Sequence, residues 1–96
     1  MSVYVIVQLN VHDRERYDKY SAALLPILAQ FGGSVVVADD APRVIEGEWT
    51  GNRVVVLRFP DRDAFRAWGT SPEYQAIVPD RHAGAHTVAT FVRGLD

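Results

Sequence analysis

The chain has 96 residues, of which 48% are hydrophobic and 23% charged, so it is expected to form one ordinary globular domain over residues 1–96. Its net charge of −2 gives no basic surface for nucleic acid, and the lack of cysteine excludes disulfides, Cys-based zinc sites and thiol catalysis. No apolar run is long enough to span a bilayer and the N-terminus reads as a strand, so we expect no membrane partner and a cytoplasmic location.

The first part of the chain predicts a strand, a helix and a second strand. Val3 to Asn10 alternates in the manner of a strand, whereas Arg14 to Phe31 repeats apolar residues at three- and four-residue steps, as an amphipathic helix does. Pro26 lies inside that pattern and predicts a kink or a break. Gly32-Gly33 then ends the helix. Ser34 to Ala38 is the second predicted strand.

The stretch from Val44 to Phe59 predicts a hairpin whose turn is Thr50-Gly51-Asn52. Its second strand is apolar on both sides, which indicates a sheet with both faces covered. With Trp49 placed opposite Arg53, one face carries Ile45, Trp49, Val55, Leu57 and Phe59, and the other carries Val44, Glu46, Glu48, Val54, Val56 and Arg58.

The last part of the chain predicts two helices and a final strand. Asp61 caps a short helix, and Ser71 is the N-cap of another helix that should end near Pro79 or Gly84. His86 to Arg93 is the last strand. The order of elements is βαββαβ with the second helix split, which is the α+β ferredoxin-like pattern of an antiparallel sheet with helices on one face.

The sheet face without helices is expected to be apolar. Its members are Val44, Val54 and Val56 from the hairpin, Tyr4 and Ile6 from the first strand, and Val88 and Val92 from the last. Monomers rarely leave so large an apolar surface in water, so we expect a homodimer in which a second copy covers this face.

Several segments also carry a family pattern: Val44-Ile45-Glu46-Gly47-Glu48-Trp49, Arg53 to Asp61, Ala67-Trp68, Ser71-Pro72-Glu73-Tyr74-Gln75 and Arg81. Together they resemble domain-of-unknown-function family 1330. The resemblance implies a dimeric α+β barrel in which two ferredoxin-like sheets face each other, and it implies no established reaction. Gly69 stands where the family more often has an aromatic residue. Arg58 stands where an acidic residue is common, so an acid–base role is not carried over to it.

Glu46 and Arg58 are the candidate catalytic residues. In the assumed register they lie diagonally on one sheet face, where the carboxylate can act as a base or the pair can bind a polar ligand. The more economical interpretation is an ion pair that holds the sheet or the dimer in register.

Tyr20, Trp49, Trp68 and Tyr74 are the candidates for an aromatic-walled cleft between sheet and helices. Arg81 is placed with them because its guanidinium can bind a carboxylate through two hydrogen bonds. The simpler alternatives are core packing for the aromatic residues and a helix C-terminal cation for Arg81.

No metal site and no cofactor are predicted. His82 and His86 have the spacing of a helical metal pair, but no third ligand is evident and the helix is expected to end between them.

Two functions remain open at this point. The first is binding of a small polar or aromatic metabolite in the cleft between sheet and helices. The alternative is a cofactor-independent enzyme of the dimeric α+β barrel kind, catalysing proton transfer or an oxygenase or isomerase reaction. The sequence does not decide whether the protein is an enzyme.

Overall fold

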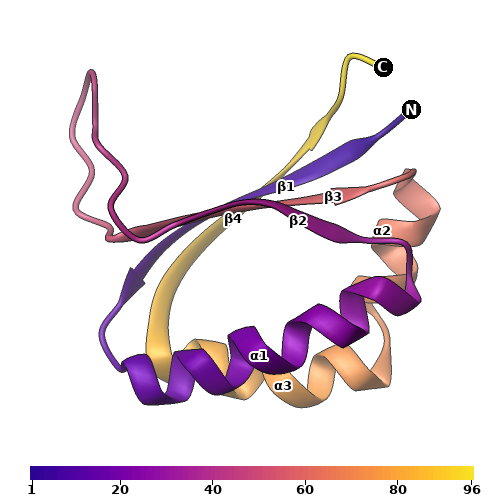
Figure 1. The fold of residues 1–96 in the computed structure, drawn as a ribbon, viewed down its shortest axis with the longest axis horizontal. Coiled ribbons are helices and arrows are strands. Elements are labelled where there is room, and N and C mark those ends of the chain that lie inside the picture. The colour runs from indigo at the N-terminus through magenta and orange to yellow at the C-terminus, as the bar shows by residue number, and fades with distance from the viewer.

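The computed structural model describes every residue from Met1 to Asp96. The elements are, in chain order, β1 (Val3–Val11), α1 (Arg14–Gln30), β2 (Ser34–Asp39), β3 (Arg53–Phe59), α2 (Arg62–Gly69), α3 (Pro72–Gly84) and β4 (Ala85–Arg93). The four strands form one antiparallel sheet in the order β2-β3-β1-β4 (Figure 1). This arrangement confirms the predicted α+β ferredoxin-like fold.

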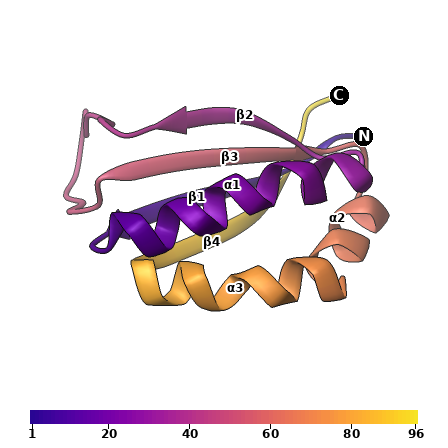
Figure 2. The same ribbon diagram turned by 60° about the horizontal axis from the view of Figure 1, so that its bottom comes forward.

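The helices lie on one face of the sheet, and the core fills the space between the two layers (Figures 1 and 2). Val55, Leu57 and Phe59 of β3 point into this core and are 6%, 3% and 0% exposed, as predicted. They alternate with Val54, Val56 and Arg58, which lie on the opposite face and are only half-buried.

The ends of α1 follow from local sequence. Asp13 is the N-cap, and its carboxylate accepts a hydrogen bond from the backbone N–H of Arg16. After the helix, Gly32 has a φ of +72°, a conformation that favours glycine. Gly33 lies so close to the ring of Phe59 that an added Cβ would be 2.6 Å from it, which fixes the turn against the core.

Of the two outcomes predicted at Pro26, a kink or a break, the break does not occur, since α1 runs without interruption from Arg14 to Gln30. Pro26 and Ala22, the residue four positions earlier, both lie on the exposed side of the helix. The carbonyl that loses its helical partner is therefore free to bind water, so the helix tolerates the proline.

The predicted strand Val44–Trp49 is wrong. Residues 40–52 form a long connection between β2 and β3, here called the arm, which contains no strand and projects beyond the sheet (Figure 1). β2 occupies the position beside β3 that the prediction gave to Val44–Trp49. The arm pairs with no strand of the sheet, and Ile45 at its tip is 99% exposed rather than facing the helices.

The two ends of the arm are fixed to the sheet. Asp40 accepts hydrogen bonds from Arg14 at 3.1 Å and from Arg53 at 2.7 Å, and these contacts lower the pKa of the Asp40 carboxyl. At the other end, the Asn52 side chain accepts from the N–H of Val11 and donates to its carbonyl. The arm is therefore anchored to the rest of the fold at both of its ends.

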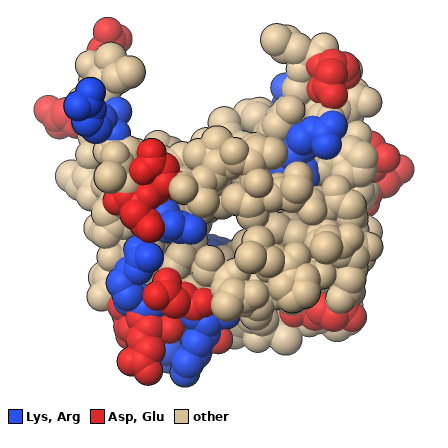
Figure 3. Space-filling view, in the orientation of Figure 1, with Lys and Arg blue, Asp and Glu red and all other residues tan.

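The sheet face opposite the helices is open, and we call it the open face. Its apolar members are Tyr4, Ile6, Val37, Val54, Val56, Val88 and Val92. The arm rises on one side of it and the chain termini on the other, so the molecular surface is hollowed between them (Figure 3). None of the helices has the length and apolar character needed to cross a membrane.

Candidate functional site

A cavity of about 200 Å³ lies between the helix-facing side of the sheet and the helices. Its lining combines residues from β1, β3 and β4 with residues from all three helices: Val5, Val7, Tyr20, Leu57, Phe65, Trp68, Tyr74, Arg81, Thr87, Ala89 and Phe91. Nine of these residues are hydrophobic, so the cavity is an apolar chamber with a few polar groups at defined positions.

The aromatic wall of the cavity comes from three different helices. Tyr20 belongs to the apolar stripe of α1, Trp68 lies near the end of α2, and Tyr74 lies in the first turn of α3. Ser71, the N-cap of α3, accepts a hydrogen bond from the backbone N–H of Tyr74. This hydrogen bond fixes the first turn of α3 and with it the position of Tyr74. The rings of Trp68 and Tyr74 are in contact, with centroids 4.0 Å apart.

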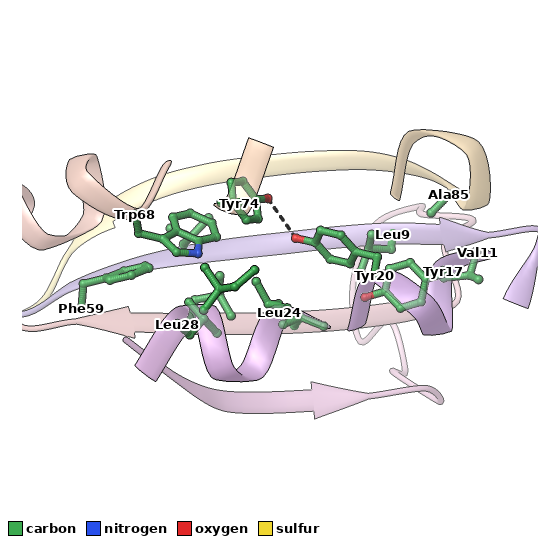
Figure 4. Packing of buried hydrophobic residues seen from close by; sticks show 14 of the residues in the cluster. Leu9, Val11, Tyr17, Tyr20, Leu24, Leu28, Phe59, Trp68, Tyr74 and Ala85 are labelled. Carbon is green, nitrogen blue, oxygen red and sulfur yellow. Dashed lines mark hydrogen bonds between the residues drawn. The ribbon is translucent and has the colours of Figure 1, made fainter. Parts of the chain in front are cut away.

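The hydroxyl groups of Tyr20 and Tyr74 point toward each other from α1 and α3 and are 2.9 Å apart (Figure 4). One hydroxyl proton is enough to make this hydrogen bond, so the other remains free to be donated. Burial, together with the neighbouring Tyr74, raises the pKa of Tyr20 far above its usual value. Tyr20 therefore stays a neutral phenol at physiological pH and does not serve as a base.

Two further polar atoms of the lining residues are buried without a partner. These are the hydroxyl oxygen of Thr87 on β4 and the indole Nε1 of Trp68 on α2. Buried polar groups are nearly always hydrogen-bonded, because leaving one unpaired costs about 1–3 kcal/mol. The lining residues therefore include two polar atoms whose hydrogen-bonding capacity is unused.

Arg81, in the last turn of α3, is half-buried beside the aromatic wall. Its guanidinium carbon lies 5.6 Å from the centroid of the Tyr20 ring, a distance typical of a cation–π contact. The ion pairs of the molecule join Arg14, Arg16, Arg53 and Arg58 to aspartates, and none involves Arg81. Arg81 thus brings a positive charge to the cavity with no carboxylate to neutralise it.

Four of the five predicted ligand-binding residues line this one cavity, namely Tyr20, Trp68, Tyr74 and Arg81. That a ligand occupies it stays a prediction. Trp49 lies in the arm, where its ring packs over Gly51, and does not line the cavity.

Sequence reasoning missed Thr87, Ala89 and Phe91, which form the β4 wall of the cavity. A signal was available, because these residues alternate with Val88 and Val92 and must therefore point to the other side of the sheet.

The predicted pairing of Glu46 with Arg58 within one chain is wrong. Glu46 is exposed in the arm, far from the diagonal position that a strand would have given it. The Arg58 guanidinium instead donates a hydrogen bond to Ser2 at 2.5 Å and lies 3.9 Å from the carboxylate of Asp96. Neither residue lines the cavity, and a chemical role for either stays a prediction.

The histidines are not gathered into a metal site. His82 is exposed on α3, while the ring of His86 lies 5.0 Å from that of His12, at the end of the sheet away from the termini. No group of three or more His, Cys, Asp or Glu side chains is placed to hold a metal ion.

Comparison with solved structures finds the same fold in proteins of distant sequence. A protein of unknown function from Rhodopseudomonas palustris has a TM-score of 0.86 and 18% identity, with 99% of this chain and 83% of that chain covered. A dimeric ferredoxin-like protein of unknown function from Jannaschia sp. CCS1 has a TM-score of 0.73 and 14% identity, covering 98% and 100%. SnoaB, a cofactor-independent oxygenase from Streptomyces nogalater, has a TM-score of 0.70 and 16% identity, covering 99% and 94%.

At these identities the likeness establishes the fold alone. No curated protein matches the sequence. The model of the family described as domain of unknown function (DUF1330) matches residues 2–95, which is nearly the whole chain. This match confirms the resemblance seen in the sequence motifs: the chain belongs to the DUF1330 family.

Proposed function

We propose that the protein is a homodimer that binds a small, largely apolar molecule in the cavity between its sheet and its helices. The observation that carries the proposal is the cavity itself, which is lined by nine hydrophobic residues and yet has unpartnered polar atoms in its walls. A purely structural core would be expected to close such a space, because protein interiors pack with few voids larger than a water molecule.

The volume limits the size of the ligand. An apolar cavity of about 150 Å³ is known to accept benzene, so a space of about 200 Å³ suits one ring with a small substituent. Drug-sized ligands occupy about 300–1,000 Å³, and a molecule of two or three fused rings would need the cavity to open further.

The homodimer is proposed from the open face and the arm. Val88 is 61% and Ile6 37% exposed on the open face, and Ile45 at the tip of the arm is 99% exposed. A second copy packed against this face would bury the apolar side chains of both sheets at once, with the arm extending along the partner. The Jannaschia protein of the same fold is described as dimeric, which agrees with this arrangement.

The alternative, a cofactor-independent enzyme, has the fold of SnoaB in its favour. An enzyme that removes a proton from its substrate needs a base within hydrogen-bond reach. The lining residues include no aspartate, glutamate or histidine, and Tyr20 is held neutral by burial. Binding is therefore the function that we propose for this cavity.

Filling the cavity should abolish binding while leaving the fold intact. Ala89 lines the cavity from β4 and is exposed at its rim, so Ala89→Leu adds apolar volume to the site with little strain. With phenol as a neutral one-ring probe, we expect the thermal stability of the wild type to increase as the phenol concentration is raised. We expect Ala89→Leu to bind phenol at least about tenfold more weakly, since the leucine occupies the space of the ring.

Ala76→Leu is the matched control, because Ala76 is exposed on α3 and does not line the cavity. It should respond to phenol as the wild type does. Equal phenol binding by Ala89→Leu and the wild type would refute this site, and so would a wild type that phenol does not stabilise.

A further inference from the structure

Building on the proposed function, we propose that the ligand of the cavity is a small aromatic carboxylate, whose carboxylate group is bound by Arg81 and whose ring lies among the apolar lining residues. The polar groups around the cavity, and the positive charge that they leave unbalanced, indicate which kind of molecule the cavity binds.

The polar groups of the lining are rich in hydrogen-bond donors. The Arg81 guanidinium and the Trp68 indole N–H donate only, and the Thr87 hydroxyl has a proton to donate. The Tyr20–Tyr74 pair keeps one spare hydroxyl proton after its mutual hydrogen bond. No carboxylate or imidazole side chain supplies acceptors in return, so the lining favours a ligand that accepts several hydrogen bonds. An ionised carboxylate has two oxygens and about four acceptor positions.

The positive charge of Arg81 also indicates a ligand that carries a carboxylate. Arg53, the comparable half-buried arginine, is neutralised by Asp40 at 2.7 Å and also donates to the Tyr17 hydroxyl at 3.2 Å. No ion pair joins Arg81 to a carboxylate, and its guanidinium lies over the Tyr20 ring. A guanidinium matches a carboxylate through two parallel hydrogen bonds, so a carboxylate on the ligand is the partner that suits this unpaired charge.

The carboxylate nearest to Arg81 in the sequence is already engaged. Asp80 accepts a hydrogen bond from the Arg16 guanidinium at 2.9 Å, which ties α3 to α1 on the outer side of the two helices. Arg81 therefore has no ready intramolecular partner, and its positive charge remains available to a ligand.

The aromatic residues that line the cavity indicate that the remainder of the ligand is a flat ring. Trp68, Phe65 and Phe91 lie close together, with Phe65 and Phe91 ring centroids 4.9 Å apart and Phe65 and Trp68 centroids 6.1 Å apart. Aromatic surroundings of this kind favour a flat ring, which stacks or meets them edge-to-face. One ring with one carboxylate also fits the volume of about 200 Å³.

The test compares benzoate with benzamide, which has nearly the same shape but no charge, by calorimetric titration of the full chain. In the wild type we expect benzoate to bind at least about tenfold more tightly than benzamide, because a hydrogen bond to a charged group is stronger than one between neutral groups. Arg81→Gln should abolish this preference, because it should lower the affinity for benzoate at least about tenfold and change the affinity for benzamide little. Arg81→Lys should retain part of the preference, since it keeps the charge but loses the planar fork.

Arg62→Gln is the control for net charge, because it removes the same charge from an exposed position on α2 and should leave both affinities unchanged. Equal binding of benzoate and benzamide to the wild type would overturn the carboxylate inference and leave the proposed cavity site standing. A benzoate preference that survives in Arg81→Gln, or is lost equally in Arg62→Gln, would also overturn it. Failure of the wild type to bind phenol would instead overturn the proposed function itself.

Discussion

Replacing Phe59 by alanine is expected to lower the free energy of unfolding by about 3–5 kcal/mol, the usual range for deleting a buried aromatic ring. Phe59 is 0% exposed at the end of β3 and packs against Phe65 and Trp68, with centroids 5.8 and 5.1 Å away. Its ring also presses on Gly33, so it joins the turn after α1 to the sheet and to α2. Domains of this size are stable by only about 5–15 kcal/mol, and the variant should therefore unfold at a much lower urea concentration.

Phe31→Ala is the control for this measurement. Phe31 is half-buried at the C-terminal end of α1, so the same truncation should have less than half the effect. Both variants must be compared with the wild type at one protein concentration, since the stability of a dimer depends on it. Equal losses in the two variants would contradict the placement of Phe59 at the centre of the core.

Replacing Val56 by glutamate is expected to convert the proposed dimer into a monomer, raising its dissociation constant at least about a hundredfold. Val56 lies on β3 in the middle of the open face, directly beside Ile6 of β1 and Val37 of β2. In a monomer the new carboxylate would reach water. In the proposed dimer it would be buried without a partner in both copies, and a single uncompensated buried charge costs about 3–5 kcal/mol. A hundredfold change corresponds to about 2.8 kcal/mol and leaves room for partial relaxation.

Light scattering at micromolar concentration measures this effect, and circular dichroism checks that the variant is folded. Ala22→Glu, which adds the same charge on the exposed side of α1, should remain dimeric. A wild-type monomer at this concentration, or a Val56→Glu variant that dimerises like the wild type, would contradict the role given to the open face.

The sequence predicted correctly which side chains face the core wherever the local hydrophobic pattern agrees with the fold. The alternation along β3 predicted which side chains face the helices, and burial of Val55, Leu57 and Phe59 confirmed it. Helical periodicity and the Ser71 cap placed the aromatic residues on the inner sides of α1, α2 and α3, so Tyr20, Trp68 and Tyr74 meet in space. These predictions succeeded because period and capping depend on residues close together in the chain.

The arm could not be predicted in the same way. Val44 and Ile45 are strand-forming residues, but a strand needs a neighbour to pair with, and β1 and β2 already take the two positions beside β3. An extended apolar segment can pair with a strand, project from the sheet or pack on a second copy of the chain. Which of these it does depends on contacts with residues that are remote in sequence. The same limit applies to Arg58, whose partners Ser2 and Asp96 come from the two ends of the chain.

The unpartnered polar atoms around the cavity could not be predicted from the sequence either. Thr87 and Trp68 reveal their missing hydrogen-bond partners only when the surrounding layers are assembled. Periodicity predicts which side chains turn inward, but it does not tell whether the interior they share is filled.

The indole N–H signals of the two tryptophans report whether a ligand enters the cavity between sheet and helices. In a ¹H–¹⁵N titration with phenol, assigned with the help of Trp49→Phe, we expect the Trp68 indole signal to shift progressively and saturate. Its Nε1 is buried and unpartnered in a residue of the cavity wall, whereas Trp49 lies in the arm outside it and should scarcely respond. A Trp68 signal that stays in place, or one that moves no more than that of Trp49, would show that the cavity is not a site for such a ligand.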